Sequence, residues 1–94
     1  APVLLETVID EKMNKYKIIF QAVGEPEWPF GRTKVKVTLV NSNNEKIKSF
    51  EEYIQDDGVT ARKENIEVNW YDNYVEIVLI GGEQEDDIHQ LKYK

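Results

Sequence analysis

The chain has 94 residues, of which 40% are hydrophobic and 32% charged, with a formal net charge of −6 and no cysteine. This size predicts one domain, residues 1–94, with a modest hydrophobic core. The lack of cysteine excludes disulfides, thiolate metal sites and cysteine nucleophiles. An acidic chain is not expected to bind nucleic acid. The sequence contains no run of about 20 apolar residues, so direct insertion of these 94 residues into a membrane is not expected.

Alternation of apolar and polar residues predicts strands through the first half of the chain. Three such runs are bounded by turn-forming residues: 3–9, 16–23 and 33–41. In the third run, Val35, Val37 and Leu39 are expected to face a core, with lysines on the opposite face, as in a half-buried antiparallel strand. The segment 47–55 fits either a helical stripe or a strand. We favour a strand, because its neighbours are strands and it is short for a free-standing helix.

The second half of the chain shows the same pattern. Three further runs are predicted as strands: 66–70, 74–80 and 88–93. The first two are expected to form a hairpin, and Trp70 is expected in the core because it continues the face of Ile66 and Val68. Seven short strands with no long helical pattern predict an antiparallel β-sandwich of immunoglobulin-like type, with a small β-barrel as the alternative.

The loop at residues 24–31, Gly-Glu-Pro-Glu-Trp-Pro-Phe-Gly, is the strongest candidate for a binding surface. Proline restricts the backbone, so ordering this loop on binding costs little entropy, and Trp is enriched among interface hot spots. Trp28, Pro29 and Phe30 are therefore the candidate partner-binding residues. The alternative is that Trp28 or Phe30 folds back to cap the core, because a small core needs its aromatic residues.

This loop also carries a resemblance to a known group of proteins. Together with Gln55–Gly58, Ile66–Trp70 and the acidic stretch Gly82–Asp86, it resembles small domains of unknown function found mainly in Gram-positive bacteria, often behind a signal peptide or lipoprotein anchor. The resemblance implies an all-β fold and an extracytoplasmic location, secreted or anchored through a segment outside this sequence. It implies no activity and no site residue.

The residues do not favour an enzyme. His89 is the single histidine, and Ser42 and Ser49 are the only serines. A Ser-His-Asp system needs an oriented base beside the nucleophile, and these residues are spread over a turn, a solvent face and the last strand. Adjacent acids such as Glu51 and Glu52 are expected to point apart and stay ionised, unlike the carboxylate pair of a glycosidase. No catalytic residue is predicted.

No metal site or cofactor is predicted, with calcium kept as the alternative. Calcium takes six to eight oxygen ligands, and two loops together could supply carboxylates, without the spacing of an EF-hand: Asp56, Asp57, Glu83, Glu85, Asp86 and Asp87. A zinc site is not expected, because one histidine and no cysteine cannot supply the usual tetrahedral set.

Taken together, these patterns predict a non-catalytic extracytoplasmic module with a structural or protein-interaction role at the bacterial cell envelope. The alternative is a calcium- or carbohydrate-binding β-sandwich, in which Trp28, Tyr71 and Tyr74 would stack on sugars. Lysines at 34 and 36 on one strand face discourage edge-to-edge association and favour a monomer.

Overall fold

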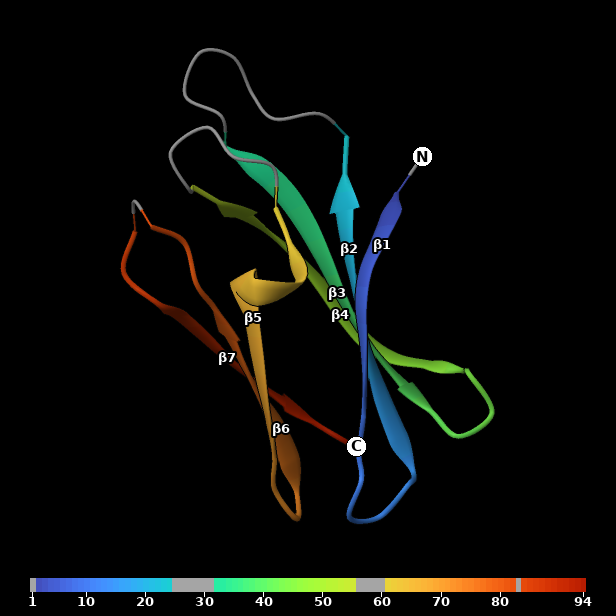
Figure 1. The fold of residues 1–94 in the computed structure, drawn as a ribbon. Coiled ribbons are helices and arrows are strands. Elements are labelled where there is room, and N and C mark those ends of the chain that lie inside the picture. Colours follow the sequence, from blue (N-terminus) through green and yellow to red (C-terminus); the bar gives the residue numbers. More distant parts are fainter. Residues whose placement is uncertain (1, 25–31, 56–60, 83) are drawn as a thin grey trace.

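The structure is a computed structural model that describes residues 2–24, 32–55, 61–82 and 84–94. Within these ranges the chain forms seven strands and a single turn of 3-10 helix (Figure 1). The elements in chain order are β1 (Val3–Ile9), β2 (Tyr16–Val23), β3 (Thr33–Asn41), β4 (Lys46–Ile54), η1 (Lys63–Asn65), β5 (Ile66–Trp70), β6 (Tyr74–Leu79) and β7 (Asp87–Lys92).

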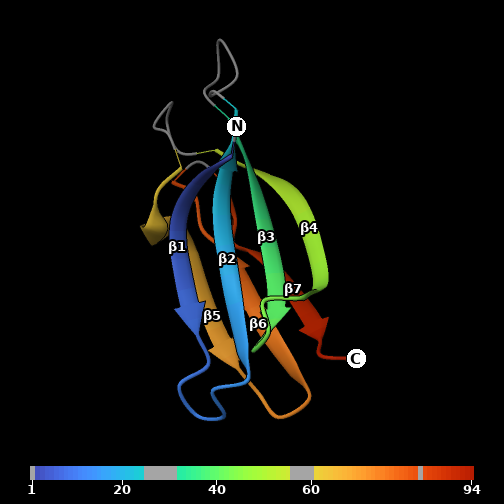
Figure 2. The ribbon, with the colours of Figure 1, turned by 90° about the vertical axis from the view of Figure 1, so that its right-hand side faces the viewer.

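The strands form two antiparallel sheets, with the orders β1-β2-β3-β4 and β5-β6-β7. The two sheets lie face to face (Figures 1 and 2), which confirms the predicted β-sandwich; the described residues form no closed barrel. Within each sheet the strands follow chain order, whereas immunoglobulin sheets interleave strands from distant parts of the chain. The immunoglobulin comparison therefore extends to the two-layer architecture and not to the connections. No helix in the described ranges is long and apolar enough to cross a membrane.

The core lies between the central strands β2, β3 and β6. Their inward positions alternate as the sequence predicts, because successive side chains of a strand point to opposite faces. The fully buried side chains of these three strands include Ile18, Phe20, Val35, Val37, Leu39, Val75, Ile77 and Leu79. Trp70, predicted in the core, is partly buried and packs against it from β5.

The ambiguous segment is a strand. β4 spans Lys46–Ile54 and pairs with β3 so that Phe50 lies opposite Val37 and Ile54 opposite Thr33. Pairing with a long neighbour overrides the weak helical stripe, since cross-strand packing stabilises a strand more than local propensity opposes it.

The sandwich has two open sides, because no strand in the described ranges joins the edge of one sheet to the edge of the other. In Figure 2, β1 and β5 lie on one side and β4 and β7 on the other.

At the end of the sandwich that carries the β5–β6 turn, the Tyr93 ring stacks on Tyr16, with 4.2 Å between ring centroids. The Tyr93 hydroxyl donates to the carbonyl oxygens of Tyr71 and Tyr74, at 2.7 and 2.9 Å. This residue after β7 thus ties the last strand to both sheets.

Candidate functional site

The predicted partner-binding residues Trp28, Pro29 and Phe30 lie outside the described residues. The chain on either side of them is described. Gly24 follows β2 with a positive φ of 78°, which glycine adopts at little cost. On the other side, the Arg32 guanidinium lies over the Tyr53 ring, 4.4 Å from its centroid. The loop as a binding surface stays a prediction.

Three of the six predicted calcium ligands, Asp56, Asp57 and Glu83, also lie outside the described residues. The flanks of their two loops do meet. The Gln55 N–H donates to Gln84 Oε1 at 2.7 Å, and a Cβ on Gly81 would lie 2.5 Å from the Gln55 carbonyl oxygen, so only glycine fits this approach.

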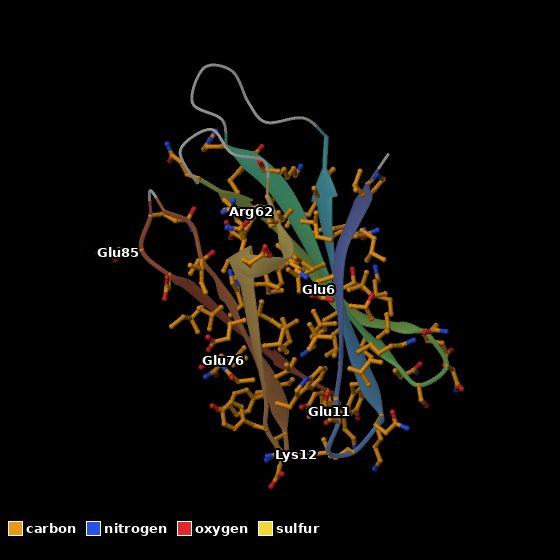
Figure 3. All side chains as sticks on the ribbon, viewed as in Figure 1. Glu6, Glu11, Lys12, Arg62, Glu76 and Glu85 are labelled. Carbon is orange, nitrogen blue, oxygen red and sulfur yellow. The ribbon has the colours of Figure 1, made fainter. Side chains whose placement is uncertain are left out.

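Of the remaining three predicted calcium ligands, two are exposed to solvent and one contacts another side chain of the sandwich. Glu85 and Asp86 are exposed in the loop before β7, where Figure 3 labels Glu85. Asp87 is the first residue of β7, and its carboxylate contacts His89. The calcium set stays a prediction, and Asp87 has a different partner in the described structure.

The predicted sugar platform is partly visible. Tyr71 and Tyr74 flank the β5–β6 turn and stack on each other, with 4.9 Å between centroids and 21° between ring planes. Because one ring covers the other, the two do not form a flat row, and the more exposed Tyr71 is the ring that a sugar could reach. Carbohydrate binding stays a prediction.

A cavity of about 480 Å³ lies beside these rings, on the side of the sandwich where β1 faces β5. Its lining includes Val8, Asp10, Val68, Trp70 and Tyr71. Glu11 and Lys12, labelled in the β1–β2 turn in Figure 3, also line this cavity. Asp10 is fully buried, and neither its Oδ2 nor the Trp70 Nε1 has a hydrogen-bond partner in the described part of the chain.

The opposite side of the sandwich holds a cluster of three ionisable side chains. His89 Nε2 lies 3.0 Å from Asp87 Oδ2 and 3.9 Å from Glu52 Oε1. One ligand atom from each residue lies within 4.8 Å of the others. The His89 ring stacks on Phe50, with 4.0 Å between centroids. Glu52 and Phe50 come from β4, and Asp87 and His89 from β7.

The sequence contains the signal for this cluster, although the predictions above do not use it. Residues two positions apart in a strand share a face. If Leu91 faces inward, His89 and Asp87 therefore face inward too, and an inward Phe50 likewise places Glu52 on the inner face. What the sequence does not show is that β4 lies across from β7, because that depends on how the two sheets pack.

A third feature is the free edge of the four-stranded sheet. Among the described strands β1 pairs only with β2, and three of its apolar side chains are exposed: Val3 by 61%, Leu4 by 59% and Ile9 by 49%. The pairing with β2 shifts register between Leu4 and Glu6. Glu6 Oε1 also accepts a hydrogen bond from the Thr7 N–H at 3.2 Å.

Comparison of the chain with family models, with curated proteins and with solved structures finds no match. The resemblance to Gram-positive extracytoplasmic domains therefore stays a prediction, and the features above must carry any functional argument.

Proposed function

We propose that this chain is a non-catalytic interaction module of the bacterial cell envelope, secreted or membrane-anchored, that binds an extended segment of a partner protein along β1. The observation that supports this function is the exposed apolar edge formed by Val3, Leu4 and Ile9. The envelope location is supported only by the resemblance of the loop sequences described above.

An edge strand offers backbone N–H and C=O groups to a partner chain, and natural sheets usually protect such edges with charge, proline or bulges. β1 has a register shift and one acidic residue, Glu6, but its other exposed positions include large apolar side chains. A partner strand that adds to this edge would gain main-chain hydrogen bonds from β1 and apolar contacts from Leu4 and Ile9.

A different protein is favoured over a second copy of this chain. Glu6 is the central residue of Val3–Ile9, so a symmetric antiparallel pair of β1 strands would set Glu6 opposite Glu6 of the second copy. Like charges directly opposite destabilise a pair of strands. A partner segment with apolar residues and a central Lys or Arg avoids this repulsion.

The test uses photo-crosslinking amino acids placed at Leu4 and, as a matched control, at Ile88. Ile88 is also 59% exposed but lies on β7 of the other sheet. Crosslinking is carried out in the organism that makes the protein, and the captured partner is then purified and titrated calorimetrically. We expect crosslinks at position 4 and not at position 88. Leu4→Lys should lower the measured affinity at least about tenfold, equivalent to one large apolar contact, and Ile88→Lys should not. Equal crosslinking at both positions, or an affinity unchanged by Leu4→Lys, contradicts β1 as the binding edge.

Carbohydrate binding is a second candidate, favoured by the cavity beside Tyr71. Tyr71 is 46% exposed, and an aromatic ring beside a cavity can stack on a sugar while its hydroxyl both donates and accepts hydrogen bonds. Titration with cell-wall glycan fragments tests it. Binding that Tyr71→Ala abolishes and Ile88→Lys does not would favour this function over strand addition.

A further inference from the structure

Ionisable side chains occupy inward positions on both β4 and β7. Glu52 lies opposite Val35 in the β3–β4 pairing, and His89 lies opposite Ile77 in the β6–β7 pairing. Both Val35 and Ile77 are fully buried core residues. Residues opposite each other in a ladder share a face of the sheet, so Glu52 and His89 extend from the two inner faces toward the same side of the sandwich.

We propose that Glu52, Asp87 and His89 bind a divalent transition-metal ion, with Zn²⁺ the expected ion, and that the ion links the two sheets. This inference does not depend on the proposed interaction function, because the cluster lies at β4 and β7 and the binding edge at β1.

The spacing of the ligand atoms fits a small tetrahedral ion. With bonds of about 2.0–2.1 Å, neighbouring ligand atoms of tetrahedral zinc are separated by roughly 3.3–3.4 Å. His89 Nε2 lies 3.0 Å from Asp87 Oδ2 and 3.9 Å from Glu52 Oε1. These two separations bracket the ideal value, and the third, between the Asp87 and Glu52 oxygens, is at most 4.8 Å. Side-chain rotations that draw the two carboxylates together would bring all three atoms to bonding distance. Water completes the tetrahedron, as in other three-ligand zinc sites.

The ligand chemistry selects a transition metal over calcium. Calcium and magnesium prefer oxygen ligands, and calcium takes six to eight of them. An imidazole nitrogen with two carboxylates suits Zn²⁺ and its neighbours in the first transition row. The expectation against zinc drawn from the sequence counted only histidine and cysteine, whereas carboxylate oxygens are also zinc ligands.

The charges of the cluster favour a cation. Two carboxylates face one imidazole, and the ion pairs recorded for the described residues give Glu52 and Asp87 no lysine or arginine partner. The neighbouring Glu51, on the outer face of β4, does have one, because its Oε1 lies 3.7 Å from Lys34 Nζ. A divalent ion bound to neutral His89 would balance both inward carboxylates.

The site combines rigid ligands with access from solvent. The His89 ring is stacked on Phe50, which fixes its plane, and ligands held on strands are more precisely placed than ligands on loops. The side chains of His89, Asp87 and Glu52 are 26%, 39% and 42% exposed, so an ion can enter and keep a water ligand.

The test is calorimetric titration of tag-free, chelator-treated protein with ZnCl₂, together with the visible absorption spectrum of the Co²⁺ complex. Three variants remove one ligand each: Glu52→Gln, Asp87→Asn and His89→Gln. The matched control is Glu51→Gln, which removes a carboxylate from the residue just before Glu52, on the opposite face of β4. Circular dichroism and urea unfolding establish that each variant is folded, and any one folded ligand variant suffices for the comparison.

We expect the wild-type protein and Glu51→Gln to bind one Zn²⁺ with equal affinity and to give the intense cobalt spectrum of a tetrahedral site. Each ligand variant should bind about 100-fold more weakly or worse, because loss of an outer-shell partner alone costs about 10–100-fold. Zn²⁺ should also raise the melting temperature of the wild-type protein, since a ligand of the native state stabilises it. Absence of saturable binding, equal weakening in Glu51→Gln, or displacement of Zn²⁺ by equimolar Ca²⁺ would each overturn the site.

Discussion

Both open sides of this sandwich carry carboxylate side chains, but the carboxylates have different partners on the two sides. On the β4–β7 side, Asp87 and Glu52 face an imidazole, and the partners come from different sheets. On the β1–β5 side, Asp10 is fully buried. Its Oδ1 accepts hydrogen bonds from the backbone N–H groups of Lys12 and Met13, both at 3.2 Å.

The difference separates a structural carboxylate from carboxylates available to a ligand. Asp10 holds the β1–β2 turn, where Asn14 adopts a positive φ of 53°, through bonds to its own neighbours in sequence. Among the described residues, Glu52 and Asp87 make no hydrogen bond that stabilises a turn, and both remain open to solvent. The partners of an acidic residue therefore indicate its role better than its burial or its position in a loop.

Replacement of Asp10 should produce the largest effect and is the most direct way to break this comparison. We expect Asp10→Ala to lower the free energy of unfolding by about 2–3 kcal/mol, because two hydrogen bonds to a charged acceptor are lost and their donors stay partly buried. Asp10→Asn retains an acceptor for the turn and should cost less than about 1 kcal/mol. Urea unfolding measures both. Equal losses for Ala and Asn would show that the charge, and not the turn, is what the fold requires.

Much of this fold could be predicted from the sequence, because strand alternation is a local signal. The runs 3–9, 16–23, 33–41 and 66–70 coincide with β1, β2, β3 and β5. β6 begins as predicted, at Tyr74, and β7 begins one residue earlier than predicted, at Asp87; each ends one residue before the predicted end. β4 needed the argument from its neighbours, since its own pattern was ambiguous.

The candidate sites were less predictable, because they depend on which strands face each other across the two layers. Asp10 in the sequence is one polar residue in a turn, whereas in the fold it is fully buried and lines the same cavity as Val68 and Trp70 of β5. The cluster of Glu52 with His89 joins residues 37 positions apart (89 − 52 = 37). No periodicity within one strand specifies that contact.

Tyr93, at the end of the sandwich that carries the β5–β6 turn, provides a test with an effect of intermediate size. Burial, followed by the negative charge of Asp10, raises the pKa of Tyr93 above its ordinary value of 10.0. The folded state therefore holds the phenolic proton to higher pH than the unfolded chain does. Its stabilising contribution is complete below pH 10 and is lost as the pH rises through the higher folded-state pKa.

Tyr93→Phe should cost about 1 kcal/mol at neutral pH, because one hydroxyl proton serves two carbonyl groups. Above pH 10 the difference between wild type and variant should shrink, as measured by urea unfolding at each pH. Asp10→Asn should move the titration of Tyr93 to lower pH, followed by tyrosinate absorbance. A wild-type stability that falls no faster than that of Tyr93→Phe would contradict the raised pKa.

The smallest expected effect concerns the β4–β7 cluster in the absence of metal. Glu52→Gln should change the free energy of unfolding by less than about 0.5 kcal/mol at neutral pH, because a partly exposed ion pair at 3.9 Å contributes little. Lys34→Ala, which breaks the outer pair with Glu51 at 3.7 Å, is the matched control and should behave alike. Added Zn²⁺ should then separate the two, raising the unfolding midpoint of Lys34→Ala and leaving that of Glu52→Gln nearly unchanged. If Glu52→Gln without metal lowered the free energy of unfolding as much as Asp10→Ala does, the carboxylates on both sides of the sandwich would be structural.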